Sequence, residues 1–217
     1  MAHGCPEDVP SPIDFRLMDD AREWAASAIL MRPWREQFFQ QFVAELQAVD
    51  HGPLSVLELG SGPGFLAQRI LTAVPDVTYT MLDFSPAMHK LARERLGPLI
   101  RHVRPIVADF KCPGWAEGLG EFDAVVTMQA VHELRHKKHA LALHQAVRRL
   151  LGAQGRYLVC DHYVGRDGMT NDALYMTVDE QRDCLAAAGY DRVVKLLDMR
   201  GLVLHRAMHL PEPMTSE

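Results

Sequence analysis

The spacing E-x-G-x-G-x-G at residues 58–64 could hold a nucleotide-like ligand against the backbone. It follows a short apolar run, Ser55–Leu59, which is typical of a strand buried on both faces. From Phe65 onward, apolar residues recur at helical spacing, so the spacing predicts a helix whose first N–H groups remain free to donate. Glycines at the turn let the chain bend tightly and let a ligand approach without a Cβ in the way. The stretch therefore predicts a strand, turn and helix that bind a ligand.

Two acidic residues narrow the chemistry of that ligand. The last glycine comes one position too early for the dinucleotide pattern G-x-G-x-x-G, and Glu58 lies inside the strand. A buried acid beside the turn suits a ligand with an ammonium group better than one with a pyrophosphate. Asp83 ends a second predicted strand, Val77–Asp83, nineteen residues past Gly64. At this interval a carboxylate can accept hydrogen bonds from two ribose hydroxyls.

A rival motif lies further along the chain. Residues 132–136 spell H-E-x-x-H, which on a helix places two imidazoles and a glutamate base at a zinc ion. A predicted strand ends at Met128, however, and this leaves little room for a helix before His132. A zinc-dependent hydrolase that uses these residues therefore stays an alternative, as does a metal that assists group transfer through His132, His136 or Asp161.

The glycine motif and Asp83 together resemble the class I S-adenosylmethionine-dependent methyltransferases, whose first motif reads E/D-x-G-x-G-x-G. The resemblance covers residues 53–207. It implies an α/β fold, a Rossmann-like sheet of seven mostly parallel strands with an antiparallel last strand, flanked by helices and preceded by an N-terminal helical cap. It also implies S-adenosyl-L-methionine as cofactor and S-adenosyl-L-homocysteine as product.

The same resemblance implies where the cofactor binds. Asp83 would meet the ribose, and Asp109, directly after the third predicted strand, would meet the adenine amino group. The implied contacts lie in the glycine turn and after each of the next three strands: Glu58, Gly60, Ser61, Gly62, Gly64, Phe65, Asp83, Phe84, Met88, Ala108, Asp109, Phe110, Met128 and Gln129.

The acceptor is less closely defined. The chain lacks the N/D-P-P-Y/F motif of many nucleic-acid and protein amino-group methyltransferases, which favours a small-molecule acceptor methylated in line at oxygen or nitrogen. If a proton must leave, His132 is the first candidate base and His162 the second, because imidazole titrates near neutrality. A protein that binds the cofactor without catalysis remains a further alternative. The candidate substrate contacts are Met18, Trp24, Arg32, Trp34 and Tyr163.

The remaining elements follow from apolar periodicity and capping signals. Residues 1–52 are expected to form an extension and a helical cap over the active site, and residues 53–217 the cofactor-binding domain. Helical spacing from Phe15 to Val49 is interrupted at Pro33. The later expected elements are a helix from about His139 to Leu151 ended by Gly152, a strand at Arg156–Cys160, a helix opened by the capping box Thr177–Glu180, and strands at Val193–Met199 and Leu202–Ala207.

Composition limits the size of the core, the kinds of partner and the cellular location that can be expected. A chain of 217 residues with 48% hydrophobic residues is long enough for one sizeable core. The net charge of −5 gives no basic excess, so a nucleic-acid partner is not expected. The sequence predicts neither a membrane span nor a signal peptide at Met1–Pro12. Four cysteines, Cys5, Cys112, Cys160 and Cys184, lack C-x-x-C spacing, which favours reduced thiols in the cytoplasm. The oligomeric state is open, with a homodimer as one alternative.

Overall fold

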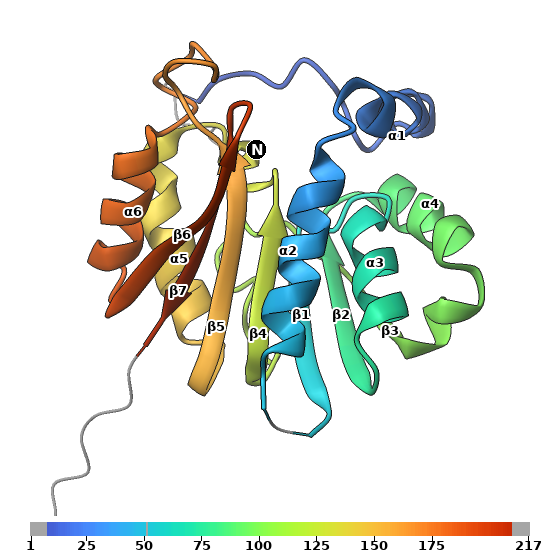
Figure 1. The fold of residues 1–217 in the computed structure, drawn as a ribbon. Coiled ribbons are helices and arrows are strands. Elements are labelled where there is room, and N and C mark those ends of the chain that lie inside the picture. The colour runs from blue at the N-terminus through green and yellow to red at the C-terminus, as the bar shows by residue number, and fades with distance from the viewer. Residues whose placement is uncertain (1–7, 51, 210–217) are drawn as a thin grey trace, which may run out of the picture.

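The fold is built on one mixed β-sheet. The computed structural model describes residues 8–50 and 52–209, and within them the sheet has seven strands in the order β3-β2-β1-β4-β5-β7-β6 (Figure 1). The strands are β1 (Leu54–Leu59), β2 (Val77–Asp83), β3 (Val103–Val107), β4 (Phe122–Met128), β5 (Leu151–His162), β6 (Arg192–Met199) and β7 (Leu202–Met208).

Strand direction confirms the predicted topology. The first five strands pair in parallel, and β7 lies antiparallel between β5 and β6. The chain moves outward from β1 to β2 and β3, then returns to place β4 on the other side of β1. Such a reversal opens a crevice at the carboxyl ends of the central strands, which is where ligands bind in open α/β sheets.

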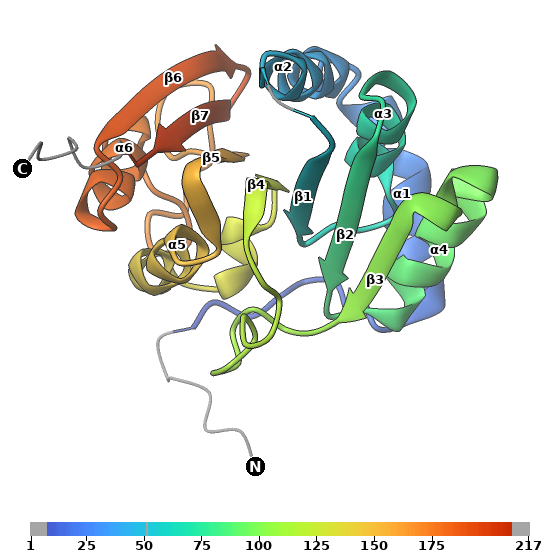
Figure 2. The ribbon, with the colours of Figure 1, turned by 90° about the horizontal axis from the view of Figure 1, so that it is seen from below.

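Helices cover both faces of the sheet. Helices α2, α3 and α4 lie against one face and α5 and α6 against the other (Figure 2). Helix α1 packs on α4 near the carboxyl ends of the strands (Figure 1). The helices are α1 (Met18–Met31), α2 (Arg35–Gln47), α3 (Phe65–Ala73), α4 (Pro86–Leu96), α5 (Ala140–Arg148) and α6 (Val178–Ala187), with short 3-10 turns η1 (Gly97–His102), η2 (Val131–Leu134) and η3 (Lys137–His139).

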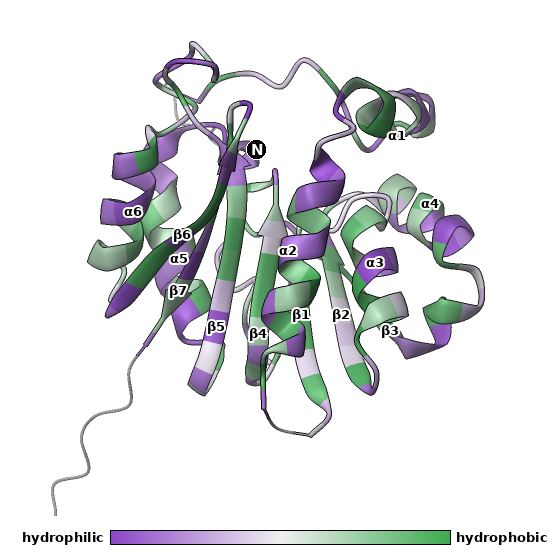
Figure 3. Cartoon of the chain, viewed as in Figure 1, coloured by the Kyte–Doolittle hydropathy of each residue, from purple (hydrophilic) through white to green (hydrophobic). Residues whose placement is uncertain are grey.

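Two apolar layers hold the helices to the sheet. Helix α2 buries Phe38, Phe39 and Phe42 completely or almost so, against the face that also carries Val56. On the other face, Leu57 packs in a layer with side chains of α5 and α6. The central strand β4 is hydrophobic over much of its length, as expected for a strand covered on both sides (Figure 3).

Local sequence signals set the helix starts. Ser85 caps α4 by accepting a hydrogen bond from the Met88 amide, and Pro86 occupies the first turn. Thr177 and Glu180 form the reciprocal capping box predicted for α6. Pro33 separates α1 from α2, as the sequence predicts.

One boundary was wrong. The helix expected from about His139 to Leu151 ends at Arg148, and strand β5 already begins at Leu151, before Gly152. The pairing of β5 with β4 is irregular here, because Leu151 lies opposite Phe122 while Arg156 lies opposite Ala124. The extra residues of β5 bulge out of the ladder at this point. Because this part of the strand contains two glycines, its sequence resembles that of a loop, and the predicted start of the strand is therefore too late.

Cys112, Cys160 and Cys184 are free thiols, and Cys5 lies outside the described residues. No helix in the described ranges has both the length and the apolar character that are needed to cross a bilayer.

Candidate active site

The glycine turn connects β1 to α3, and its three glycines serve different purposes. All three have a positive φ, which L side chains rarely adopt. A Cβ at Gly60 would lie 2.4 Å from the Cβ of Ala130, and one at Gly64 would lie 3.2 Å from the Cβ of Ala92. Gly62 has nothing within 4 Å of such an atom, so this position stays open to the cavity. Close packing thus explains two of the glycines, and ligand access suits the third.

Asp83 holds this turn in place. Its Oδ2 accepts a hydrogen bond from the Gly62 amide at 2.8 Å, and its Oδ1 accepts one from the Ser85 amide at 2.9 Å. Burial raises the pKa of the Asp83 carboxyl, while these two amide hydrogen bonds lower it. Each oxygen still has a lone pair to offer, so the carboxylate can position the turn and accept a ligand hydroxyl at the same time.

Glu58 is buried beneath the turn. Its carboxylate accepts a hydrogen bond from the Tyr79 hydroxyl at 2.9 Å. Burial raises the pKa of Glu58 to about 8, the Tyr79 hydrogen bond opposes this rise, and the charge of Asp83 adds to it. A cation bound nearby would lower the pKa again, which agrees with the predicted preference for an ammonium group.

Ionisable side chains from the segment after β4 and from the end of β5 lie close together and form one side of the site. The Nδ1 of His132 donates to Asp161 Oδ1 at 2.6 Å, and the His132 amide donates to Asp161 Oδ2 at 2.8 Å. The Nε2 of His132 lies 3.4 Å from Glu133 Oε1. Burial lowers the pKa of His132, but the two carboxylates raise it more, to about 10. In this arrangement the imidazole is protonated at neutral pH, whereas a base must be neutral; the base role of His132 stays a prediction.

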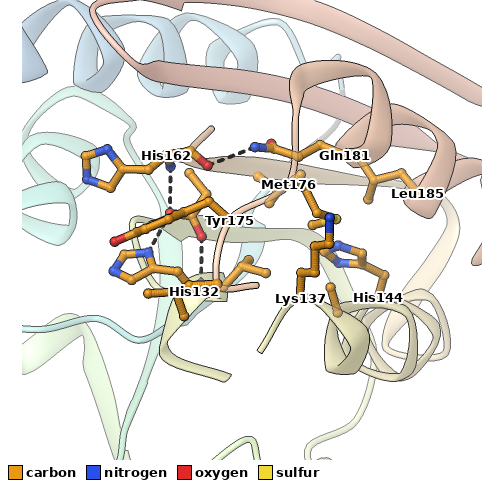
Figure 4. A pocket seen from close by; sticks show the side chains of 13 residues that line it. His132, Lys137, His144, His162, Tyr175, Met176, Gln181 and Leu185 are labelled. Atoms are coloured by element: carbon orange, nitrogen blue, oxygen red, sulfur yellow. Dashed lines mark hydrogen bonds and ion pairs between the residues drawn. The ribbon is translucent and has the colours of Figure 1, made fainter. Parts of the chain in front are cut away.

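His162 differs in charge from His132. Its Nε2 accepts a hydrogen bond from Gln129 Nε2 at 2.7 Å, and its backbone carbonyl accepts one from Gln181. Burial lowers the pKa of His162 to about 4, partly opposed by Asp161. Figure 4 shows the rings of His132, His162 and Tyr175 close together, with centroids 5.4 to 5.9 Å apart. A charged and a neutral imidazole thus share one wall with a phenol.

One cavity of about 570 Å³ joins the glycine turn to this wall. The N-terminal stretch crosses above the carboxyl ends of the strands and covers it (Figure 1). Arg135 fixes that stretch: its Nε donates to the Val9 carbonyl at 2.8 Å and its Nη2 to the Pro10 carbonyl at 2.8 Å. The Ser85 hydroxyl donates to the carbonyl of Phe15. The cavity is therefore covered by a segment tied at both ends.

Most of the predicted site residues line this cavity. They are Glu58, Gly60, Ser61, Gly62, Phe65, Asp83, Phe84, Met88, Phe110, Met128 and Gln129 from the cofactor set, Trp24 and Arg32 from the substrate set, and both His132 and His162.

The structure does not bring the other predicted residues to the cavity wall. Asp109 lines an adjoining space of about 280 Å³, beside Lys111. Tyr163 follows His162 in sequence and lies at the opposite side of the extended chain, near Asp198. Three others pack against protein: Met18 against α4, Trp34 under the guanidinium of Arg200, and Gly64 against α4. Ala108 is also absent from the wall.

Several wall residues were not predicted. Asp161 is buried behind this wall and orients His132 from 29 residues away, whereas the sequence predicts it only as a metal ligand. Glu133 entered only as part of a zinc motif. Others reach the cavity from the N-terminal stretch, from α2, from the end of η2 and from the loop after β5: Val9, Phe15, Arg35, Phe39, Arg135, Asn171, Leu174 and Tyr175. No local motif marks such residues, because only the fold brings them together.

The H-E-x-x-H stretch is not an α-helix. His132 lies in η2, Arg135 has a left-handed φ of 68°, and His136 precedes the separate turn η3. The His136 Nδ1 accepts the amide of Lys138. Within the ranges 8–50 and 52–209, no three His, Cys, Asp or Glu side chains gather as metal ligands. The helical geometry on which the zinc-hydrolase alternative depends is therefore wrong for this chain.

Comparisons with known proteins agree with this geometry. Residues 56–155 match the methyltransferase domain family. This match supports a class I S-adenosylmethionine-dependent methyltransferase. A malonyl-[acyl-carrier protein] O-methyltransferase of Geobacter sulfurreducens is 27% identical to this methyltransferase over 181 residues, which cover 76% of this chain and 65% of the relative.

Solved structures share the fold. An O-methyltransferase family protein from Burkholderia thailandensis superposes with a TM-score of 0.71 at 16% identity, covering 92% of this methyltransferase and 62% of that chain. A SAM-dependent methyltransferase from Aquifex aeolicus gives a TM-score of 0.62 at 18% identity, and the match covers 79% of this chain and 89% of that chain.

The residues present fit the cofactor of this family, S-adenosylmethionine. Two buried oxygens in the cavity wall, Ser61 Oγ and Gln129 Oε1, have no hydrogen-bond partner within the described chain. Gln129 also has a positive φ of 58°, an unusual conformation for a residue other than glycine. Together with Asp83 and Glu58, these acceptors suit a ligand that carries hydroxyls and an ammonium group.

Proposed function

We propose that this protein transfers a methyl group from S-adenosylmethionine to a carboxylate oxygen of a small-molecule acceptor. The bound cofactor supplies a methyl group already activated by its sulfonium sulfur. The residues of the chain then need to hold the acceptor beside it and to exclude water. Glu58, Ser61, Asp83 and Gln129 would hold the cofactor at one end of the cavity.

The observation that carries the proposal is that both ring nitrogens of His132 are engaged by carboxylates. The Nδ1–H of His132 donates to Asp161, and Glu133 lies 3.4 Å from Nε2. The Nε2 lone pair of His162 accepts a hydrogen bond from Gln129. Neither imidazole offers a free lone pair to a hydroxyl or ammonium proton. A carboxylate acceptor is already deprotonated at neutral pH and needs no base.

The charge of the wall supports the same acceptor. Arg32 lines the cavity and lies near enough to His162 and Tyr175 to influence their pKa values. The charge of His132 is balanced by Asp161 and Glu133, so Arg32 is the cation that can attract an anion to this end of the cavity. The Geobacter sulfurreducens relative is named for O-methylation of a malonyl group, which ends in a carboxyl group.

The test is a turnover assay with matched acceptors. Small carboxylic acids, and the alcohols and amines of the same carbon skeletons, would be incubated with protein and S-adenosylmethionine. We expect methyl esters, detected by mass spectrometry, and an activity at saturating S-adenosylmethionine that does not rise with pH between about 6 and 9. Products from only the alcohols or amines, with a rate that rises through this range, would contradict it and return His132 or His162 to the base role.

We further propose that residues 1–52 form a cap and residues 53–217 the catalytic domain, in one structural unit. Within the described part of this cap, the Val9–Phe15 stretch and α1 lie over the cavity, which supports the division. The three free cysteines favour a cytoplasmic location. A homodimer stays a prediction.

A further inference from the structure

Arg35 is a buried arginine in the wall of the cavity. It is the first residue of α2, and only 4% of its surface is exposed. Its guanidinium carbon lies 5.8 Å from the ring centroid of Trp24, 5.5 Å from that of Phe39 and 5.6 Å from that of Phe65. Three aromatic rings thus surround the cation and partly replace its water.

The charge of Arg35 has no carboxylate partner within residues 8–50 and 52–209, and its Nε is buried without an acceptor. Burial lowers the pKa of Arg35 to about 10, and nearby Arg32 contributes to the lowering. Its position in the first turn of α2 is also unfavourable, because the positive end of the helix dipole lies there. Such a charge is costly to bury without an anion.

Other buried or half-buried arginines of the molecule do have acceptors. Arg206 donates to Glu45 at 2.8 Å, and Arg156 donates to the Glu45 carbonyl at 2.6 Å. Arg95 stacks on Phe65, as Arg35 does, yet its Nε donates to the Pro63 carbonyl at 2.9 Å. Arg35 differs from these three because it lines the ligand cavity and has no acceptor within the described residues, so the missing anion should come from a ligand.

We propose that Arg35 binds the carboxylate at the methionyl end of the cofactor. Phe65, against which Arg35 packs, opens α3 directly after the glycine turn. Glu58 alternates with Val56 along β1 and so shares the sheet face that α2 covers. The ammonium and carboxylate of the methionyl group are attached to one carbon, so a site with an acid for the first needs a cation close by for the second.

This inference rests on the proposed cofactor, and the test separates the two. S-adenosylhomocysteine and 5′-methylthioadenosine share the adenosine and sulfur, but only the first has the amino-acid end. Calorimetric titration with both ligands would compare wild type, Arg35→Met and Arg35→Lys. Arg69→Met is the matched control, because Arg69 also lies over Phe39, at 5.9 Å, but pairs with Glu36 and does not line the cavity.

We expect Arg35→Met to weaken S-adenosylhomocysteine binding by about 10- to 100-fold, as for a lost charge-assisted hydrogen bond. Binding of 5′-methylthioadenosine should stay within about twofold, and Arg35→Lys should recover part of the loss because it keeps the charge. The melting temperature of ligand-free Arg35→Met should be equal to or above that of wild type, since an unpaired buried charge is removed.

Three results would overturn the inference. Equal weakening of both ligands, or none, would show that Arg35 does not recognise the amino-acid end. A lower melting temperature of Arg35→Met with an unchanged ratio of the two affinities would assign Arg35 to aromatic packing alone. Wild type that binds neither ligand would refute the proposed cofactor, and the inference with it.

Discussion

The two ends of the cavity are built in different ways. At the cofactor end, the groups that shape the site are backbone amides and glycines within residues 58–85, fixed by Asp83. At the acceptor end they are ionisable side chains from η2, from the end of β5 and from Arg32, which directly follows α1. The first is a turn held by one carboxylate, and the second is a network of ionisable groups brought together by the fold.

This difference predicts different sensitivities. Backbone geometry does not titrate, so the glycine turn should respond to steric changes and little to pH, although Glu58 beneath it has a pKa of about 8. The acceptor end joins His132 to two carboxylates, so its stability should depend on protonation. Variants that separate steric from electrostatic effects therefore test the comparison.

The largest effect is expected from Gly60→Ala. The added methyl group would meet Ala130 Cβ at 2.4 Å and would also strain a φ of +63°. We expect S-adenosylhomocysteine binding to fall by more than about 100-fold in calorimetry, because the turn must shift. Gly97→Ala is the matched control, since Gly97 has a similar φ of +52° but nothing within 4 Å of the new atom. Equal losses in the two variants would mean that strain, and not the contact with Ala130, decides the effect.

His132→Gln should destabilise the protein in a pH-dependent manner. Removing one partner of a buried ion pair leaves Asp161 unpaired and should lower the free energy of unfolding by about 3 kcal/mol near pH 6. The pKa of His132 is raised from 6.5 to about 10 on folding, so this contribution is present below about pH 6.5. It is lost as the pH rises toward 10.

Urea unfolding at pH 6 and at pH 9.5 measures the change, with the exposed His102→Gln as control. The difference between wild type and His132→Gln should shrink at the higher pH. A difference that grows with pH would contradict the charged state assigned to His132.

Arg135→Met should loosen the cover of the cavity. It removes the hydrogen bonds to the carbonyls of Val9 and Pro10, at a cost of about 1 to 3 kcal/mol for charge-assisted bonds. Hydrogen–deuterium exchange of the Val9–Phe15 stretch should become faster, while exchange of β1 and β4 stays unchanged. The exposed Arg182→Met serves as control. Unchanged exchange of the stretch would show that Arg135 does not fix it.

The smallest expected effect concerns the protonation of His162 and is measured by titrating the wild-type protein. The pKa of His162 is lowered to about 4, so its ring should stay neutral between pH 5 and 8 in NMR spectra of labelled histidine. Because folding lowers this pKa, His162 contributes stability above about pH 6.5, and that stability is lost as the pH falls toward 4. A midpoint near 6.5 for the His162 ring would show that it is not desolvated as the structure indicates.

The sequence predicts the cofactor end far better than the acceptor end. Glycine spacing and the acid after β2 are local features, and each residue acts within a few positions of its neighbours along the chain or across one strand pair. Asp161 and His132 are 29 residues apart and meet only because β4 and β5 are adjacent and end together. In the sequence Arg35 resembles an ordinary helix residue, and its place in the cavity wall follows only from the packing of α2. The acceptor end depends on contacts between residues far apart in the sequence, and no motif in a single sequence indicates such contacts.

The most direct test of the central claim is a calorimetric titration of wild type, Asp83→Ala and the exposed control Asp179→Ala with S-adenosylhomocysteine. We expect saturable micromolar binding to wild type and to the control, and a loss of at least about 100-fold in Asp83→Ala, which frees the Gly62 amide and removes the ribose acceptor. Equal affinity in all three proteins, or no binding to wild type, would contradict the assignment of this cavity to the cofactor.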